Sequence, residues 1–537
     1  MAESAHVDTF CRDHLPPREL WPDLDFSRLP ELAYPPRLNA ATELLDKAVA
    51  AGWGERTALH FPGGRWSYGQ LLATANRIAH VLVEDLNVVP GNRVLLRGPN
   101  NPMLAACWLA VLKAGGVVVC TMPLLRVREL TYIAERAQIR LALTNARIAA
   151  DCEQAMANTG HVIHYQSAQP GDLESLMAGK PEDFENCDTA ADDTALIAFT
   201  SGTTGQGKGT MHFHRDLLAA CDCFPAYVLK PEADDVFCGS PPLAFTFGLG
   251  GLLLFPLRVG ASALLLEQAT PPQLLQGIQD HRATLCFTAP TAYRAMAGMA
   301  QGFDLSSLKK CVSAGETLPK PTFEAWQRAT GLAIIDGIGS TEMLHIFISA
   351  AGDEIQPGST GRVVPGYEAR VVDDDFAEVP PGTLGRLAVK GPTGCRYLAN
   401  LERQRAYVEN GWNLTGDSYV MDADGYFWYQ ARTDDMIISA GNNVSGPEVE
   451  AVLLDHPKVS ECGVVGVPDE ERGQIVKAFV VLRPGFAAGP ELVKELQDFV
   501  KQEIAPYKYP RAVDFVDALP RTETGKLQRF RLRERGR

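Results

Sequence analysis

The sequence predicts an α/β fold with a large N-terminal domain of sheets flanked by helices, a β-rich subdomain, and a small α+β C-terminal domain. Apolar strands alternate with amphipathic helices between residues 57 and 314. Short strands with alternating apolar and polar residues follow Pro357, and the residue pattern changes again after Arg432. At 537 residues the chain is long enough for more than one core, because domains usually contain about 100–200 residues.

The N-terminal alternation begins with a predicted strand at 58–61, a glycine turn, a second short strand and a helix with apolar residues at helical spacing. Another helix is predicted at 105–112. Further strands end near glycine, proline or hydroxyl residues and are predicted at 93–96, 117–120, 141–144, 195–199, 263–266, 284–287 and 310–314. Such alternation is typical of a parallel sheet, whose ligands gather at the carboxyl ends of the strands.

The remaining segments are shorter and more varied. Strands predicted at 369–373 and 385–390 indicate the β-rich subdomain. The tail combines strand-like runs at 463–467, 478–482 and 512–516 with an amphipathic helix that carries Leu492, Leu496 and Phe499. The first ~40 residues are rich in proline and charge and predict an irregular surface arm.

Composition excludes several classes of function. The net charge of −15 and the pI near 5.3 argue against nucleic-acid binding, because no basic excess is present to release counterions. The 12 cysteines form no CxxC pair, so neither a zinc site nor a disulfide framework is predicted. The N-terminus lacks a basic region followed by an apolar core, and Lys113 and Gly115-Gly116 interrupt the most apolar window. We expect a cytoplasmic protein without a membrane partner.

The stretch from Thr200 to Gly209, TSGTTGQGKG, follows a predicted strand and combines glycines with hydroxyls. Glycine lets backbone N–H groups approach oxyanions, so the stretch predicts a phosphate-binding loop. Gly202 to Lys208 also fits the GxxxxGK pattern of P-loop NTPases, but Gly209 stands where that pattern needs Ser or Thr to hold magnesium.

Four separated segments together resemble the acyl-adenylate-forming superfamily over nearly the whole chain. They are the loop at 200–209, DGIGSTE at 336–342, WNLTGD at 412–417 with the nearby Arg432, and PRTETGKL at 520–527. The loop departs from the family pattern at Gly207, which replaces a proline, and Ile338 replaces a common tyrosine. The branch most similar to this sequence is the aryl-CoA synthetases, in particular benzoate-CoA and 2-aminobenzoate-CoA ligases.

The resemblance implies roles for individual residues. It implies a catalytic set of Lys526, Thr341, Glu342 and Lys208, with Glu342 holding Mg²⁺, a hard cation that prefers carboxylate oxygens. The implied nucleotide-binding residues are Thr200, Ser201, Gly202, Thr203, Thr204, Gly205, Gly315, Glu316, Asp336, Gly337, Ile338, Asp417 and Arg432.

The resemblance also implies two moving parts. Residues 1–433 would form the adenylate-forming domain, and residues 434–537 a small mobile lid that carries Lys526. Asp434 stands where relatives hinge between these parts. Two chemistries at one site need two arrangements of groups, which a mobile lid supplies.

The acid-binding region is expected after the phosphate loop, and the resemblance implies that it includes Phe245, Thr246, Phe247, Gly339 and His345. Aromatic walls suit an aryl ring, and His345 and Thr246 can hydrogen-bond a ring substituent or the carboxylate. No acidic residue occurs between Ser240 and Glu267, so the ammonium of an amino acid would lack a partner. The hydroxyl of Thr246 favours 2-aminobenzoate over benzoate.

The predicted enzyme is therefore an acid-thiol ligase that uses ATP, CoA and Mg²⁺ to convert an aromatic carboxylic acid to its CoA thioester through an aryl-adenylate. Three alternatives stay open: an adenylation enzyme that loads a carrier protein, a P-loop phosphohydrolase, and a catalytically dead nucleotide-binding relative. The sequence leaves the oligomeric state open, with a homodimer as one expectation.

Two other patterns are weaker. The alternating His212 and His214 suggest a metal site, but no third ligand accompanies them, and structural histidines are the favoured interpretation. The basic run at 508–511 either steers the phosphates of CoA or is solvated surface.

Overall fold

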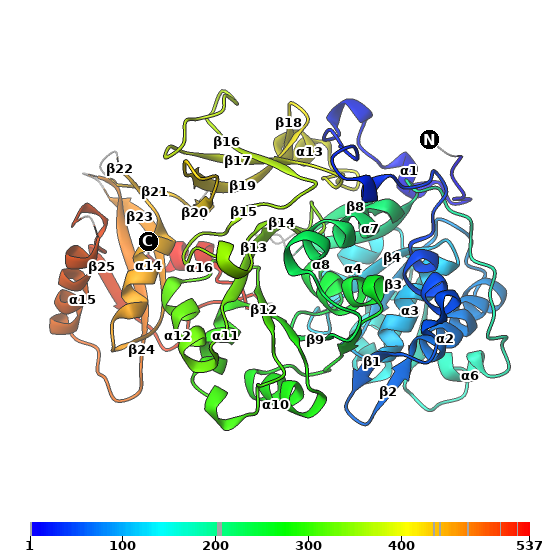
Figure 1. Cartoon of the computed structure of the whole chain (residues 1–537). Helices are drawn as coiled ribbons and strands as arrows, with labels where there is room; N and C mark the ends of the chain where they lie inside the picture. Colours follow the sequence, from blue (N-terminus) through cyan, green and yellow to red (C-terminus); the bar gives the residue numbers. More distant parts are fainter. Residues whose placement is uncertain are drawn as a thin grey trace.

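The computed structural model describes residues 3–200, 207–432, 435–439, 442–469, 472–504, 506–522 and 525–536. Within these ranges the chain forms two large sheets flanked by helices, a smaller β-rich unit, and a C-terminal α+β unit, as the sequence predicts. Figure 1 shows the two large sheets with the β-rich unit above them and the C-terminal unit at one side. The α/β fold class is confirmed.

The first large sheet has the order β6-β5-β3-β4-β7-β8. Its strands are β3 (Arg93–Arg97), β4 (Val117–Thr121), β5 (Leu141–Asn145), β6 (His161–Tyr165), β7 (Thr194–Thr200) and β8 (Lys208–Phe213). The pairs from β6 to β7 are parallel, whereas β8 runs antiparallel to β7. The loop that the sequence singles out therefore connects two antiparallel neighbours.

The second large sheet has the order β15-β14-β13-β12-β11-β9-β10-β1-β2. Its strands are β1 (Thr57–Phe61), β2 (Gly64–Ser67), β9 (Val236–Gly239), β10 (Ser262–Leu264), β11 (Leu285–Thr288), β12 (Lys310–Ser313), β13 (Ile334–Gly339), β14 (Ile346–Ser349) and β15 (Arg362–Val363). Strand β10 ends two residues before its predicted end, although the Leu265 N–H still donates a 2.9 Å bond to the His60 carbonyl of β1.

Helices cover both large sheets. They are α1 (Phe10–Asp13), α2 (Tyr68–His80), α3 (Pro102–Lys113), α4 (Val127–Arg136), α5 (Ala149–Met156), α6 (Leu173–Met177), α7 (His214–Asp222), α8 (Thr246–Leu249), α9 (Phe255–Val259), α10 (Pro271–His281), α11 (Pro290–Ala297) and α12 (Lys320–Thr330). Helix α3 is buried on every side, which explains the apolar window around it. Its Lys113 is buried as well, and the ammonium lies 2.6 Å from the Asp46 carboxylate. Among the described residues, no helix has the length and apolar character needed to cross a membrane.

The two smaller sheets complete the fold. The β-rich unit contains α13 (Leu401–Tyr407) and the strands β16 (Glu368–Val372), β17 (Leu384–Lys390), β18 (Val408–Glu409), β19 (Trp412–Met421) and β20 (Phe427–Arg432). The C-terminal unit contains α14 (Gly446–Asp455), α15 (Pro490–Glu503), α16 (Arg529–Gly536) and the strands β21 (Ile437–Ser439), β22 (Asn442–Val444), β23 (Val459–Asp469), β24 (Gly473–Leu482) and β25 (Ala512–Phe515). It packs against the side of the second sheet where α12 contacts α14 (Figure 1).

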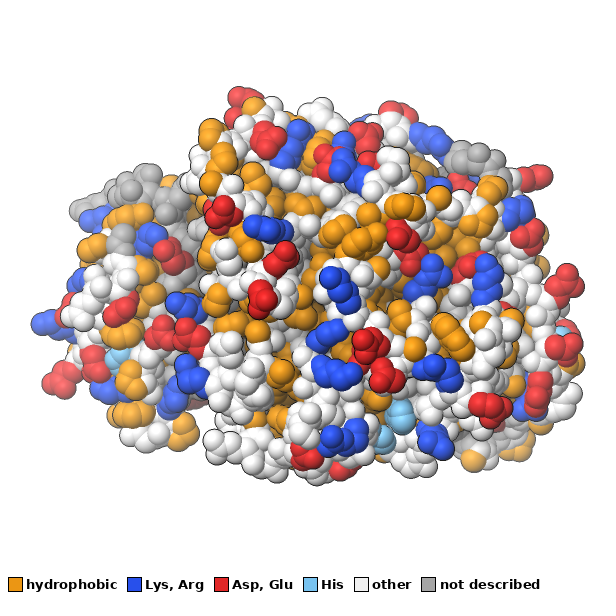
Figure 2. Space-filling view, viewed as in Figure 1, with side chains coloured by type: hydrophobic (Ala, Val, Ile, Leu, Met, Phe, Trp, Pro, Cys, Tyr) orange, Lys and Arg blue, Asp and Glu red, His pale blue; other side chains and the backbone are white. Residues whose placement is uncertain are grey.

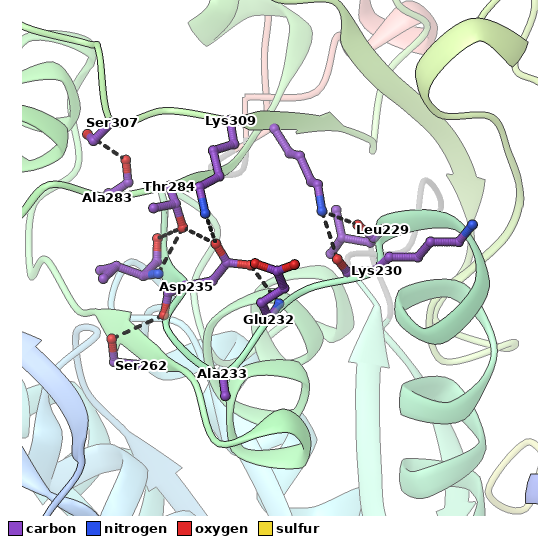
Figure 3. Close-up of polar contacts among 12 residues, drawn as sticks. Leu229, Lys230, Glu232, Ala233, Asp235, Ser262, Ala283, Thr284, Ser307 and Lys309 are labelled. Atoms are coloured by element: carbon purple, nitrogen blue, oxygen red, sulfur yellow. Dashed lines mark hydrogen bonds and ion pairs between the residues drawn. The ribbon is translucent and has the colours of Figure 1, made fainter.

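A buried polar cluster ties the beginnings of four neighbouring strands of the second sheet (Figure 3). Asp235, which is 2% exposed, accepts a 2.8 Å hydrogen bond from the Thr284 hydroxyl and a 2.7 Å bond from the Glu232 backbone. The Lys309 ammonium lies 3.4 Å from the same carboxylate. The Lys310 ammonium donates to the carbonyls of the turn before β9. Because these groups satisfy one another, the cluster stabilises the sheet rather than offering a ligand site.

All twelve cysteines are free thiols, and only Cys187 is not fully buried. Buried thiols of this kind behave as small apolar side chains.

Candidate active site

The strands β7 and β8 flank the predicted phosphate loop. Thr200 ends β7 and pairs in register with Lys208, the first residue of β8. The residues Ser201, Gly202, Thr203, Thr204, Gly205 and Gln206 lie outside the described residues. A strand-to-strand connection differs from the P-loop, in which the loop opens a helix, so the P-loop interpretation is wrong for this chain. A Cβ at Gly207 would lie 2.9 Å from the Thr200 carbonyl oxygen, so this backbone leaves little space for the proline of the family pattern.

Thr341 and Glu342 are held from two sides. The Tyr397 hydroxyl donates a 2.5 Å hydrogen bond to Oε1 of Glu342. The His212 ring, in the tautomer with a proton on Nε2, donates a 2.7 Å bond to the Thr341 carbonyl. Segment 396–398 runs beside β8, with backbone bonds of 2.8 and 2.9 Å from Met211 to Arg396 and from Leu398 to Gly209. The strand that begins with Lys208 is thereby joined to the Thr341–Glu342 pair.

A buried ion pair supports this arrangement. Arg396 pairs with Asp216 at the start of α7, and both side chains are completely buried. Asp216 also accepts a 2.9 Å bond from the Phe213 backbone, and the Arg396 guanidinium lies over the Phe213 ring. The Arg396 guanidinium lowers the pKa of Asp216 against the effect of burial. This buried ion pair joins α7 to the segment that directly precedes Tyr397.

Asp417 and Arg432 are cross-strand partners in the β-rich unit. They occupy paired positions on β19 and β20, and their charged groups lie 3.2 Å apart. Burial raises the pKa of Asp417, and the charge of Arg432 acts against this effect. The Arg432 guanidinium also donates a 3.1 Å bond to the Thr415 carbonyl.

Lys526 reaches this same group of residues from the C-terminal unit. A Cβ at Gly315, whose φ is +89°, would lie 3.7 Å from the Lys526 side chain. Burial lowers the pKa of Lys526, and the charges of Glu316 and Asp417 raise it in part. The residue is nevertheless exposed to solvent, so its ammonium is only partly shielded by the surrounding protein.

Lys208 lies within the electrostatic reach of Glu342, which also acts on Lys526. Burial and the charge of Arg403 lower its pKa, whereas the charge of Glu342 raises it. The structure therefore brings together Lys208, Glu342, Asp417, Arg432 and Lys526, which come from four separated motifs. Asp434, the predicted hinge, lies outside the described residues.

The ends of β12 and β13 form the predicted base-binding wall. Asp336 is paired in register with Ser313, two residues before Gly315. Its Oδ1 is buried without a hydrogen-bond partner among the described residues, and burial raises the pKa of the carboxyl to about 7. Ile338 is half-buried beside it, and a Cβ at Gly337 would lie 2.8 Å from the Ile346 side chain. An unpaired buried acceptor of this kind is available to a ligand N–H donor.

The predicted acid-binding residues meet behind α8. Phe245 precedes this helix, Thr246 and Phe247 form its first turn, and Phe247 contacts His345 at 5.7 Å between ring centroids. A Cβ at Gly339 would lie 2.6 Å from the His345 carbonyl oxygen, so this glycine allows the chain to fold back there. The aromatic cage around the imidazole is completed by Phe224 and Phe255, at 5.8 and 4.5 Å.

His345 is 3% exposed, and neither ring nitrogen forms a hydrogen bond with good geometry to a described residue. Burial lowers its pKa to about 3, with partial compensation by the Phe247 backbone. The imidazole is therefore neutral at physiological pH. A Cβ at position 250 would lie 2.6 Å from its Nε2, which explains Gly250.

The residues present fit a magnesium ion. One oxygen of Glu342 is bound by Tyr397, and no described residue hydrogen-bonds the other. Among the described residues, no group of three metal-ligating side chains exists. This is consistent with Mg²⁺, which is commonly held by one or two carboxylates together with substrate phosphates.

Comparisons with known proteins agree with this geometry. Residues 46–397 match the family of AMP-binding enzymes, and residues 448–526 match the AMP-binding enzyme C-terminal domain. The chain belongs to the AMP-binding enzyme family. The resemblance to its aryl-CoA synthetase branch is confirmed.

Three relatives illustrate the branch. The chain is 36% identical to a benzoate–CoA ligase of Thauera aromatica, over 94% of this chain and 97% of the relative. It is 32% identical to a 3-hydroxybenzoate–CoA ligase of Aromatoleum sp. (strain CIB), over 93% and 97%. The structure of the anthranilate CoA ligase AuaEII in complex with anthranoyl-AMP is similar with a TM-score of 0.89 and 34% identity, covering 94% of this chain and 99% of that one.

For this AMP-binding enzyme, several contacts have no counterpart in the motif analysis. They involve Tyr397 and Arg396, which have no distinctive local pattern, and His212 and Arg521, which lie within patterned segments that imply no role in the site for them. The pair His212 and His214 is the nearest signal. His214 accepts a 3.1 Å bond from the Ala40 backbone, so both histidines are structural, as favoured by the sequence.

Other surface features lie apart from the active site. A cavity of about 1000 Å³ lies between β2, α10 and the start of α3, and its lining includes none of the predicted site residues. Lys508 of the basic run is paired with Glu448 at 2.6 Å. On the face shown in Figure 2, acidic and basic side chains are interspersed, without a broad basic area of the kind that binds nucleic acid.

Proposed function

We propose that this protein is an ATP-dependent aryl-CoA ligase that activates a small aromatic carboxylate, 2-aminobenzoate or benzoate. The observation that carries the proposal is the position of Lys526, which reaches from the C-terminal unit to the cluster of Glu316, Glu342 and Asp417. This arrangement suits a reaction in which negative charge develops on a phosphate.

In the first half-reaction a carboxylate oxygen of the acid attacks the α-phosphorus of ATP. The new acyl–phosphate bond replaces the bond to pyrophosphate, which leaves. Lys526 and Lys208 offset charge on the phosphates, and the Asp417–Arg432 pair is positioned for the ribose. Bound to Glu342, Mg²⁺ would supply further shielding of the phosphate oxygens.

In the second half-reaction the CoA thiol loses its proton and attacks the acyl carbon, and AMP leaves. Lys526 has no phosphoryl transfer to assist in this step. The lid formed by residues 434–537 is proposed to rotate about Asp434 and to open a path for the thiol.

The aromatic cage supports an aryl substrate. Phe247, Phe255 and Phe224 surround a neutral imidazole whose nitrogens form no hydrogen bond of good geometry to the residues that the structure describes. A ring with an ortho amino group can use both the apolar walls and the imidazole acceptor. The named relatives act on benzoate, 3-hydroxybenzoate and anthranilate, which is 2-aminobenzoate.

The test is pyrophosphate release with a panel of benzoate, 2-aminobenzoate, hydroxybenzoates, cinnamate and short fatty acids. Aromatic acids should release pyrophosphate and form AMP, and the thioester should form with free CoA. A reaction restricted to aliphatic acids would contradict the aryl proposal, and ADP as the product would contradict adenylation. Transfer to a carrier protein in preference to CoA would favour the alternative adenylation enzyme.

The choice of acid is tested at His345. In a His345→Leu variant, the preference for 2-aminobenzoate over benzoate should fall about tenfold or more, because a buried amino group would lose its acceptor. An unchanged preference would assign no role in substrate selection to the imidazole.

A further inference from the structure

Arg521 begins the loop that carries Lys526, and its side chain hydrogen-bonds the backbone of that loop. Its Nη1 donates a 2.7 Å hydrogen bond to the Gly525 carbonyl, the residue directly before Lys526. The loop closes on itself through a 2.7 Å bond from the Thr522 backbone to the Lys526 carbonyl and a bridge between Arg521 and Leu527. Gly525 has a φ of +88°, a conformation that L side chains rarely adopt. The described ends of this loop, 521–522 and 525–527, are therefore held together by Arg521 as well as by the backbone.

The same guanidinium joins the two parts of the molecule. Its Nη1 lies 3.3 Å from Oε1 of Glu316, which follows β12 in the second sheet. Its Nη2 lies 2.6 Å from Oε2 of Glu461 on β23 in the C-terminal unit. The side chains of Arg521, Glu316 and Glu461 are 28%, 17% and 44% exposed. The contact to Glu316 is thus the better shielded of the two from solvent screening.

The contact to Glu316 lies directly beside the contact made by Lys526. Gly315 faces the Lys526 side chain, and the next residue, Glu316, accepts from Arg521. Lys526 and Arg521 therefore approach the same two-residue segment of the nucleotide site. The planar guanidinium presents its N–H donors in fixed directions, whereas the three donors of an ammonium rotate about a flexible stem.

We propose that Arg521 is a positioning residue that docks the Lys526 loop on Glu316 for the first half-reaction. The proposal rests on the proposed function, because the first half-reaction is the step in which Lys526 acts. Arg521 touches neither reacting group in this assignment and works through the placement of Lys526.

The contacts of Arg521 to Glu316 and to Glu461 would respond differently to a rotation of the lid. Arg521, Gly525 and Glu461 belong to the C-terminal unit and would move together. Only the contact between Arg521 and Glu316 would be broken. The contact between Arg521 and Glu316 is therefore specific to the arrangement in which Lys526 faces the nucleotide site. Its loss should affect adenylation selectively.

The experiment compares Arg521→Ala and Arg521→Lys with the matched control Arg535→Ala, an exposed arginine on α16 of the same unit. The first half-reaction is followed by pyrophosphate release, and the second by thioester formation from supplied aryl-adenylate and CoA. In Arg521→Ala, kcat for adenylation should fall roughly 10- to 100-fold, since a misplacement of about 1 Å can reduce a rate about 10²-fold. Thioester formation should stay within about threefold of the native rate, because Lys526 is not needed there.

Arg521→Lys keeps the positive charge but removes the planar guanidinium. It therefore distinguishes the effect of the fixed N–H directions from the effect of charge alone. It should recover only part of the loss. A double-mutant cycle of Arg521→Ala with Glu316→Gln should show coupling in adenylation but not in thioester formation. Arg535→Ala should match the native protein in both steps, and melting temperatures of all variants report whether they fold.

An adenylation rate within about threefold of native in folded Arg521→Ala would overturn the proposal, as would an equal loss in both half-reactions. Full recovery in Arg521→Lys would overturn the role of the guanidinium fork. These results differ from a failure of the proposed function, in which the native protein itself releases no pyrophosphate with any aromatic acid.

Discussion

The hydrogen bond between Tyr397 and Glu342 gives the sharpest test of the candidate site. Tyr397→Phe removes one oxygen atom and keeps the ring that packs edge-on against Tyr407 at 5.8 Å. Tyr397 is 1% exposed, so water has little access to replace the lost donor. Glu342 would keep its charge but lose the contact that fixes its Oε1.

The expected magnitude follows from the geometry. A hydrogen bond to a charged group contributes about 1.5–3 kcal/mol. Because about 1.4 kcal/mol corresponds to a tenfold change in rate, complete transfer of this loss to the transition state predicts a decrease of roughly 10- to 150-fold in adenylation. The concentration of Mg²⁺ needed for half-maximal rate should rise as well, since Glu342 would no longer be oriented for the ion.

The assay measures pyrophosphate release as a function of Mg²⁺ concentration. Tyr407→Phe is the matched control, because that hydroxyl lies 3.3 Å from Ser340 and makes no hydrogen bond to Glu342. Thioester formation from supplied aryl-adenylate is an internal control, since it transfers no phosphoryl group. The reasoning is refuted if Tyr397→Phe leaves the rate and the Mg²⁺ dependence unchanged, or if Tyr407→Phe has the same effect.

Three further predictions follow from single groups. Lys526→Ala should lower adenylation on the order of 10²–10³-fold and spare thioester formation from aryl-adenylate, and equal losses in both assays would contradict its role. We expect Asp336, whose pKa burial raises to about 7, to accept a hydrogen bond from the adenine amino group more strongly when it is ionised. Thus kcat/KM for ATP should fall as the pH decreases from 8 to 6, and Asp336→Asn, whose amide oxygen does not titrate, should flatten this profile. Asp235→Ala should lower the free energy of unfolding in urea by about 1–3 kcal/mol by leaving Thr284 and the Glu232 N–H unpaired, whereas the pH profile for ATP should not change.

Much of the fold is encoded in local sequence patterns. The strands β3, β4, β5 and β11 lie within a residue or two of their predicted positions, because each is an apolar run ended by a turn residue. The order of strands in the sheets has no such local signal. Strand β1 pairs with β10, about two hundred residues away, and β8 turns back on β7 rather than continuing the parallel pattern. Pairings of this kind depend on the packing of helices against both sheet faces.

The candidate site also combines residues that a local motif identifies with residues that no local motif identifies. Motifs identify Lys208, Glu342, Asp417 and Lys526, because nucleotide chemistry requires particular groups at particular spacings, and the structure places them together. The hydroxyl that holds Glu342 comes from Tyr397, 55 positions away in the sequence. Any residue on that segment that reached the carboxylate could serve as the donor, so no sequence spacing reveals it.

Charge balance explains why the supporting contacts matter. Glu316, Glu342 and Asp417 offset part of the positive charge of Lys208, Arg432 and Lys526 and of the neighbouring Arg403 and Arg521. The polyphosphate of ATP adds negative charge, which the loop backbone and a cation at Glu342 would help to offset. Each cation has to be placed where charge develops, because a preorganised group stabilises that charge without reorganising during the reaction. The orientation of Glu342 by Tyr397 and of Lys526 by Arg521 is therefore expected to affect rate more than affinity.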